Sequence, residues 1–348
     1  LFCGAGSVAS HVAQNFPVKV LACDLQKYAA VLAASQIERT TNFFSEKTFL
    51  DWTNQAELRI RDYGGLWERA LEASNLFGSN DDIRAQIQAA RSLCAEAPDF
   101  FPITRAYGGY YYSPVQTILI DAFRMSLPLR HKNTALASLI SASSTCAASP
   151  GHTAQPFSTK DSALPHLCGA WRKDLKSTLN SALEKLADNY SIIKGKAMQS
   201  DALSFSKKMK EGDIAFIDPP YSEVQYSRFY HVLESIATGD VGLVSGVGRY
   251  PSILQRPQSE FCLVTKSTAA FKELMKSVSE KGAEAIVTFP AGIASNGLSG
   301  SQVEEISDMF FQVRKKKITS TFSTLGGNAL TRTARKTATE LVLYLAPK

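Results

Sequence analysis

The chain has 348 residues, of which 45% are hydrophobic and 20% charged, and its formal net charge is +6 at pH 7. This composition fits two domains, or one domain with a large insertion, and excludes fibrous and disordered proteins. No apolar run is long enough to cross a membrane and no secretory leader is visible, so we expect a cytoplasmic protein without a membrane partner. The modest positive charge is compatible with a polyanionic partner.

The first residues predict the end of a strand, a turn at Gly4 and Gly6, a short helix, and a second strand over 18–23 that ends at Asp24. From about 27 to 196 the periodicity is mostly helical. One helix there should begin at Ser113, an N-cap followed by Pro114.

Two further features mark the mostly helical region. Four leucines spaced along residues 175–186 predict an amphipathic helix. Residues 141–160 are small, polar and rich in turn formers, so they predict a long loop.

The alternation of strands and helices resumes near Met198. A short apolar strand ends at Asp218, and Tyr226 to Leu233 has helical spacing. A helix should begin at Ser267, followed by a buried strand over 285–290.

The C-terminal part predicts one helix and a hairpin. A capping box at 301–304 should begin a helix that reaches about Val313, which places the basic run 314–317 at a helix end. Two strand-like runs then close the chain, with Arg332 and Arg335 in the turn between them.

Alternating strands and helices predict an α/β protein with a mostly parallel, doubly wound sheet, to which the terminal hairpin adds antiparallel strands. Residues 1–40 and 197–348 would form the sheet domain. Residues 41–196 would form a large, mostly helical inserted lobe.

Acids stand at strand ends, where α/β sheets bind ligands. The glycine turn lets the backbone approach a ligand closely, and Asp24, about twenty residues on, could accept hydrogen bonds from ribose hydroxyls. A plain turn with a surface acid remains the alternative.

The four residues Asp218-Pro219-Pro220-Tyr221 are the most specific signal. A lone Asp after a strand is usually a helix cap or a solvated turn residue. Two prolines fix the backbone and remove two donors, which leaves a stiff stretch of acceptors beside an aromatic face. Such a stretch suits a planar base that carries an exocyclic amine. We therefore assign the catalytic role to these four residues.

At these positions the sequence resembles the Dam-like class of DNA adenine N6-methyltransferases. Asp218 to Tyr221 match its DPPY motif, and Phe2 to Gly6 match its FxGxG cofactor motif. The resemblance covers residues 1–30 and 198–237, with a long insertion between them. The cofactor-binding residues that it implies are Phe2, Cys3, Gly4, Ala5, Gly6, Asp24, Asp201 and Ala202.

The resemblance also implies a Rossmann-like fold, S-adenosyl-L-methionine as cofactor, double-stranded DNA as partner, base flipping, and target recognition by the inserted lobe. It suggests a restriction-modification or other defence system, with a cognate restriction endonuclease or other subunits as partners. The class usually has a further cofactor-contacting segment just before FxGxG. We expect either that residues precede Leu1 in the intact protein or that this part of the site comes from elsewhere.

Candidate DNA contacts are less specific, and each has an ordinary structural alternative. The tyrosine-rich stretch 105–112 could contact DNA or seal the interface of the lobe. The candidates are Gln225, Tyr226, Arg228, His152, Gln155, Arg332 and Arg335.

Several functions remain open at this stage. N4 methylation of cytosine uses the same amine geometry, and an idle DNA-binding subunit could share the fold. A dinucleotide oxidoreductase would explain the glycine turn but not Asp218 to Tyr221. The six cysteines form no CxxC pair and the five histidines are scattered, so the sequence predicts no metal site.

Overall fold

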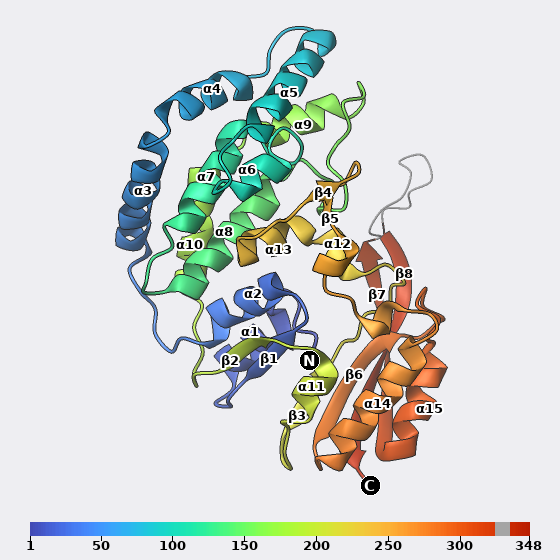
Figure 1. Cartoon of the computed structure of the whole chain (residues 1–348). Coiled ribbons are helices and arrows are strands. Elements are labelled where there is room, and N and C mark those ends of the chain that lie inside the picture. The colour runs from blue at the N-terminus through green and yellow to red at the C-terminus, as the bar shows by residue number, and fades with distance from the viewer. Residues whose placement is uncertain (324–334) are drawn as a thin grey trace.

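The computed structural model describes the backbone of residues 1–323 and 335–348, and the side chains of 1–319 and 339–348. Arg332 and the side chain of Arg335 therefore lie outside the described residues. Figure 1 shows a lobe of helices beside a part that contains the strands. No helix among the described residues has the length and apolar character needed to cross a membrane.

Two groups of strands make up the sheet part. β1 (Leu21–Asp24) pairs in parallel with β2 (Lys196–Gln199). A four-stranded sheet has the order β3-β6-β8-β7. Its strands are β3 (Ile214–Ile217), β6 (Glu284–Pro290), β7 (Phe311–Ser323) and β8 (Arg335–Pro347).

The pairing within the four-stranded sheet is mixed. β3 and β6 are parallel, whereas β8 is antiparallel to both β6 and β7. The predicted α/β class and the antiparallel terminal hairpin are therefore confirmed. The strands are not mostly parallel as predicted, because the terminal hairpin adds two antiparallel pairings to the two parallel ones and the strands fall into separate groups. The two short hairpin strands β4 (Val244–Ser245) and β5 (Tyr250–Pro251) form a separate ribbon.

The first residues lie between the two strand groups, as the N label in Figure 1 indicates. The amino group of Leu1 donates to the carbonyl of Phe216 on β3 at 2.8 Å. The amide of Cys3 donates to the carbonyl of Cys23 on β1 at 2.9 Å. The turn that follows Cys3 is thereby placed between the carboxyl ends of β1 and β3.

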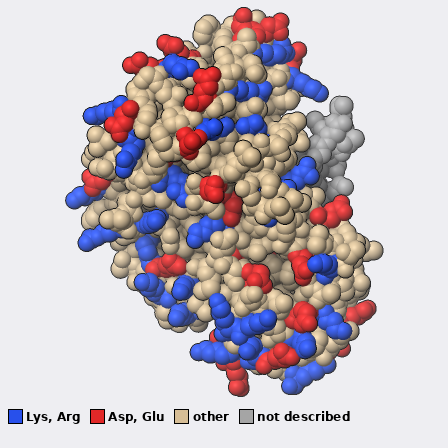
Figure 2. Space-filling model, viewed as in Figure 1, with Lys and Arg blue, Asp and Glu red and all other residues tan. Residues whose placement is uncertain are grey.

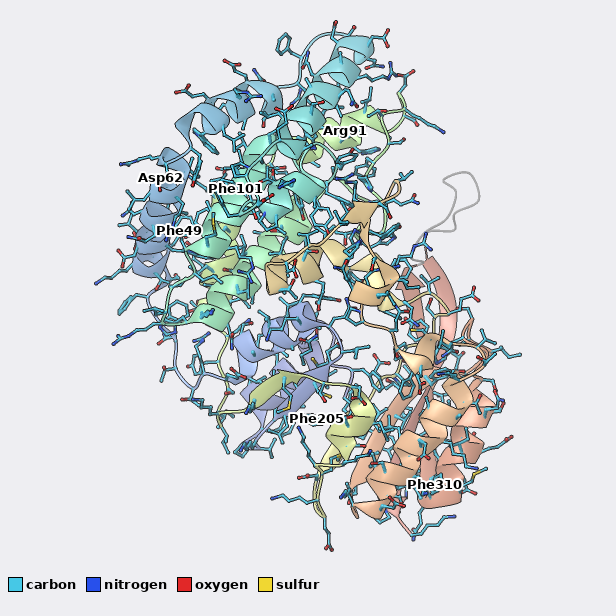
Figure 3. The ribbon with its side chains drawn as sticks, in the orientation of Figure 1. Phe49, Asp62, Arg91, Phe101, Phe205 and Phe310 are labelled. Carbon is cyan, nitrogen blue, oxygen red and sulfur yellow. The ribbon has the colours of Figure 1, made fainter. Side chains whose placement is uncertain are left out.

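Eight helices form most of the lobe, and their largest core also takes in α2 (Lys27–Ile37) and α13 (His231–Thr238). This core thus extends beyond the expected insertion, residues 41–196. Figure 3 labels Phe49 and Phe101 among its side chains. The eight are α3 (Ser45–Arg61), α4 (Gly64–Ser74), α5 (Asn80–Ala95), α6 (Pro102–Tyr107), α7 (Pro114–Met125), α8 (Lys132–Cys146), α9 (Leu164–Trp171) and α10 (Leu175–Ala187).

Two predicted helices of the lobe are confirmed, and one predicted loop is partly wrong. α7 begins after Ser113 with a complete capping box, and α10 carries the leucine stripe. The start of the expected loop 141–160 is helical instead, because α8 continues to Cys146. Its small residues Ala142, Ser143 and Cys146 are buried, so their size serves close packing there rather than a turn.

The remaining helices pack around the strands. They are α1 (Ser7–Asn15), α11 (Ala202–Ser206), α12 (Tyr226–Phe229), α14 (Ser267–Glu280) and α15 (Gly300–Phe310), with 3₁₀ turns at Ile253–Gln255 and Glu260–Cys262. The helix predicted from Tyr226 to Leu233 is interrupted at Tyr230, whose φ of −126° is not helical.

The prediction for the C-terminal helix was wrong at both ends. The capping box is formed by Ser299 and Gln302, and α15 ends at Phe310. The basic run 314–317 therefore lies in β7 and not at a helix end. β7 is the edge strand of the four-stranded sheet, where lysines are favoured because they discourage pairing with another chain.

A buried carboxyl in the lobe gives a testable pH dependence of stability. Asp121 accepts hydrogen bonds from the amides of Ile103 and Thr104 at 3.2 and 2.8 Å. Burial outweighs these bonds and raises the pKa of Asp121 from 3.8 to about 7. The folded protein then holds this proton more tightly than the unfolded chain. The stability from this group is complete below the unfolded pKa and is lost as the pH rises through the folded pKa.

We expect Asp121→Asn to flatten the fall in the free energy of unfolding between pH values of about 4 and 7, an effect on the order of a few kcal/mol. Urea unfolding across this range measures it. Asp62→Asn, which changes an exposed aspartate labelled in Figure 3, should leave the slope as it is. An Asp121→Asn variant with the wild-type slope would contradict the prediction.

Candidate active site

One cavity of about 770 Å³ opens where the ends of β1 and β3 face α11, α12 and the segment 257–262. It brings together most of the site residues predicted from the sequence. Those that line it are Phe2, Gly4, Asp24, Asp201, Ala202, Asp218, Pro219, Pro220, Tyr221, Gln225 and Tyr226. A second cavity, of about 790 Å³, lies on the lobe between α4 and α5 and contains none of them.

The glycine turn and Asp24 form one end of the cavity. Gly4 has a φ of +51°, a backbone conformation that residues other than glycine rarely adopt. Its amide donates to one carboxylate oxygen of Asp24 at 2.9 Å, and the amide of Gln26 donates to the other at 3.0 Å. Asp24 therefore holds the glycine turn through the Gly4 amide, and the Gln26 bond orients its carboxylate, while its oxygens keep further acceptor sites for a ligand.

The other residues of the turn face away from the cavity lining. Gly6 begins α1, and a side chain on it would lie 3.0 Å from the Cα atom of Ala33 on α2. The thiol of Cys3 points to the carbonyl of Ala29 on α2 at 3.9 Å. Cys3, Ala5 and Gly6 are not among the residues that line the cavity.

The two acids at this end differ in their electrostatics. Burial raises the pKa of Asp24, against the opposing effect of its two backbone hydrogen bonds. Burial also opposes ionisation of Asp201, but hydrogen bonds from Ser204 outweigh it and lower the pKa of Asp201. Asp201 caps α11 by accepting from the amide of Ser204 at 2.8 Å.

Asp218 stands at the end of β3 and is open to solvent on the cavity side. The hydroxyl of Thr288 on β6 donates to Asp218 Oδ1 at 2.9 Å. The surrounding protein still removes enough water to raise the pKa of Asp218, and the Thr288 bond partly offsets this. β6 therefore orients the carboxylate of Asp218, which lines the cavity, and the second carboxylate oxygen has no protein donor among the described residues.

The two prolines have different surroundings. The buried side-chain amide of Asn296 donates to the carbonyls of Pro220 and Phe261, at 2.9 Å each. Phe261 in turn packs edge-on against Phe2, with ring centroids 5.0 Å apart. No hydrogen bond within the described part of the chain uses the carbonyl of Pro219. Asp218 and Pro219 thus offer acceptors, whereas Pro220 is used to hold the turn.

The aromatic and polar residues that follow the motif divide into exposed and structural ones. Tyr221 stands at the mouth of the cavity with 44% of its surface exposed. The side-chain amide of Gln225 is bonded to the backbone of Ser259 twice, at 2.9 and 2.7 Å. Gln225 therefore lines the cavity by holding the 257–262 segment in place.

Three candidate DNA contacts lie outside the cavity. His152 accepts from the amide of Ala154 at 3.2 Å and packs edge-on against Phe229, whereas Gln155 is exposed. Arg228 lies beside the ring of Tyr250. Within the tyrosine-rich stretch, Tyr107, Tyr111 and Tyr112 are fully buried, which agrees with the packing alternative.

The sequence reasoning missed Thr288, Asn296 and Phe261. Thr288 could have been found from the sequence, because it carries the one hydroxyl in the apolar run "AIVTFP". A hydroxyl in a buried strand needs a hydrogen-bond partner. Asn296 lies in an irregular segment and Phe261 in the 3₁₀ turn Glu260–Cys262, both far along the chain from Asp218, where spacing carries no information about contact.

The comparison with known proteins agrees with this arrangement. Residues 147–289 match the model of the D12 class N6 adenine-specific DNA methyltransferase family. The resemblance to adenine N6-methyltransferases is confirmed. The matched range contains Asp201 and the whole motif from Asp218 to Tyr221, and it reaches back into the helical lobe.

One curated relative supports the match over a short stretch. The modification methylase LlaI of Lactococcus lactis subsp. lactis is 40% identical over 68 residues, which is 19% of this chain and 10% of that protein. The matched stretch thus spans about a tenth of the relative's length. No solved structure matches the chain. Among the described residues, no group of His, Cys, Asp and Glu side chains is arranged to hold a metal ion.

The bond between Thr288 and Asp218 can be tested directly. Thr288→Val keeps the shape of the side chain but removes the donor, so the pKa of Asp218 should rise further because the ionised carboxylate loses a partner. Carbon NMR titration of protein with labelled aspartate carboxyls measures this shift. Thr145→Val, which changes an exposed threonine on α8, serves as the matched control. A pKa that stays the same or falls in Thr288→Val would exclude the proposed role of the hydroxyl.

Proposed function

We propose that this protein transfers a methyl group from S-adenosyl-L-methionine to the N6 amine of adenine in a specific DNA sequence. The observation that carries the proposal is that the Asp218 to Tyr221 motif lines the same cavity as Gly4, Asp24 and Asp201. The strand order supports a Rossmann-like sheet with residues 1–40 and 197–348 as the catalytic domain.

The cofactor would lie at the end of the cavity formed by Gly4, Asp24 and Asp201. A glycine turn without an obstructing side chain, next to a carboxylate at a strand end, suits the ribose of a nucleoside, and Asp201 with Ala202 would lie near its adenine. When bound, the cofactor supplies an electrophilic methyl group on a sulfonium. The ring of Phe2, which packs edge-on against Phe261, would form the wall at this end of the cavity.

The reacting amine would be held at the other end. The N6 lone pair of adenine is delocalised into the ring, which makes the amine a poor nucleophile. The carboxylate of Asp218 and the carbonyl of Pro219 would each accept one N6 hydrogen, which favours a pyramidal nitrogen with its lone pair directed at the methyl group. Catalysis would then rest on positioning and electrostatics.

The target base must leave the duplex to reach this cavity. Enzymes that modify a base inside DNA extrude it and stack it against aromatic side chains. Tyr221 is the exposed aromatic residue of the motif at the mouth, so it would receive the flipped adenine. Tyr226, which also lines the cavity, would support it.

The relative's name supports a role in modification, so we extend the proposal to a restriction-modification system in the cytoplasm, with a cognate endonuclease or another defence subunit as partner. Incubation with labelled S-adenosyl-L-methionine and DNA of mixed sequence, followed by nucleoside analysis, tests the reaction. Label in N6-methyladenine supports the proposal. Label in N4-methylcytosine would favour the rival reaction, and no label would favour an idle DNA-binding subunit.

Asp24 provides a test of the cofactor end. Asp24→Ala should weaken binding of S-adenosyl-L-methionine by about 1.5–3 kcal/mol for each charge-assisted hydrogen bond lost. Calorimetric titration measures the affinity. Asp213→Ala, which removes an aspartate on the surface turn before β3, is the matched control. Unchanged affinity in Asp24→Ala would remove this residue from the site.

Asp218 and Tyr221, at the two ends of the motif, should have different roles in the reaction. Asp218→Ala removes an acceptor used most in the transition state, so turnover should collapse while cofactor binding stays nearly intact. Tyr221→Ala loses a stacking face worth about 1–3 kcal/mol per base and should lower turnover less steeply. Tyr221→Phe keeps the ring and should retain much of the activity.

Single-turnover methylation of DNA with a fluorescent base at the target separates capture of the base from chemistry. Tyr221→Ala should mainly weaken binding of the flipped base, whereas Asp218→Ala should mainly slow the methyl-transfer step. Methylation at the wild-type rate by Asp218→Ala would overturn the mechanism, because the reaction would then not need the Asp218 carboxylate.

Target recognition should reside in the inserted lobe, residues 41–196, because of its size and its position between the two halves of the catalytic domain. Exchange of this lobe for that of a relative with another target should change the DNA sequence that is methylated. Sequencing of methylated sites reads out the result. An unchanged site would place recognition in the C-terminal part of the chain.

A further inference from the structure

Two arginines flank one tyrosine beside the candidate active site. The guanidinium carbons of Arg228 and Arg256 lie 5.1 and 5.5 Å from the centroid of the Tyr250 ring. Arg228 is on α12, Tyr250 is on the short strand β5, and Arg256 follows a 3₁₀ turn. Three separate segments therefore converge to hold two positive charges around one ring, an arrangement that we call the arginine clamp.

Neither guanidinium of the clamp is neutralised. Among the described residues, every ion pair of an arginine or lysine with a carboxylate within 4.0 Å involves other residues. Burial lowers the pKa of Arg256 most, and the nearby positive charge of Arg228 lowers it further. Holding two unpaired cations together costs free energy, which an anion between them would recover.

Another pair of arginines offers an internal comparison. Arg91 and Arg249 flank Tyr110 at 4.3 and 4.6 Å, and Figure 3 shows Arg91 on α5. Their Nε atoms donate to the carbonyls of Gly109 and Ala106, at 3.0 and 2.8 Å. These bonds give Arg91 and Arg249 a structural role at the junction of the lobe and the hairpin.

The clamp lacks such bonds. Arg256 Nε is buried without a hydrogen-bond partner among the described residues, and Arg228 Nε reaches only the hydroxyl of Tyr250, at 3.3 Å. That hydroxyl is itself anchored on the carbonyl of Ala154. The guanidinium groups thus lie against the ring, and no hydrogen bond among the described residues uses their terminal nitrogens.

The position of the clamp indicates which anion it would meet. Ser227 and Pro257, which line the cavity, are the direct neighbours of Arg228 and Arg256 in the sequence. The face of the molecule in Figure 2 carries basic and acidic side chains interspersed, without a continuous basic belt. The two arginines of the clamp are therefore a more specific sign of an anion-binding site than the net charge of the chain.

We propose that Arg228 and Arg256 bind a backbone phosphate of the DNA strand that carries the flipped nucleotide. Arginine binds phosphate oxygens through two parallel hydrogen bonds, and a phosphate contact fixes the register of the strand without reading its sequence. The clamp would set where the extruded base enters the cavity. This inference rests on DNA as the substrate of the proposed function, but it makes no use of the methyl-transfer step.

The test is the salt dependence of DNA binding, measured with a fluorescein-labelled duplex of mixed sequence. Loss of one phosphate contact lowers the slope of log affinity against log salt concentration by about 0.9. Arg228→Gln or Arg256→Gln should each lower the slope, and the double variant should lower it by about 0.9, because both arginines bind the same phosphate. The weakening should be similar for duplexes of different sequence, because a phosphate contact is independent of the bases.

Arg314→Gln, which changes an exposed arginine near the start of β7, the edge strand on the side of the sheet opposite β3, is the matched control and should keep the wild-type slope. Since Arg228 is exposed, its single variant keeps the test decisive even where Arg256→Gln disturbs folding. Wild-type slopes in Arg228→Gln overturn the proposal. Reduced slopes in a protein that methylates no DNA would uphold the clamp and reject the proposed function.

Discussion

The side-chain amide of Asn296 holds the candidate active site together. It joins the carbonyl of Pro220 to that of Phe261, and Phe261 packs against Phe2 of the glycine turn. One buried amide thereby connects the two ends of the cavity. Without it, two buried carbonyls would lose their donor, at a cost of about 1–3 kcal/mol each. The geometry of Asp218 and Pro219 depends on this bond, since two prolines fix the local backbone but do not fix where the turn sits.

The helical lobe is bound to the site through helices on both sides of the insertion. Glu234 on α13 accepts from the amides of Lys27 and Tyr28 at the start of α2, at 2.8 and 2.9 Å. Tyr107 in the lobe lies 2.9 Å from the hydroxyl of Ser235 on α13. Because Tyr28 also lines the cavity, a displacement of the lobe on contact with DNA would also move the wall of the cavity. Recognition by the lobe and chemistry in the cavity would share one packed core.

The sequence allowed several strands and helices, and the position of the Asp218 to Tyr221 motif at a strand end, to be predicted, because each depends on neighbours in the chain. The capping box at Ser113 and the acid at the end of β3 are local signals of this kind. The role of Asn296 is set by contacts with residues 35 and 76 positions away, which no spacing reveals. The basic run 314–317 was misplaced for a related reason. Charge alone suits a helix end and an edge strand equally, and only pairing with β8 decides between them.

The turn of Asp218 and Pro219 offers only acceptors, with a rigid backbone that cannot turn a donor toward the cavity. A base that carries a keto oxygen in place of an exocyclic amine would bring its lone pairs against those of the protein. Neither side could relieve the repulsion by rotation, and with the base in place the acceptors would have no donor, at a cost of about 1–3 kcal/mol for each. Thymine and guanine would therefore be rejected at their oxygens by the same two residues that hold an amine, before any contact outside the cavity takes part.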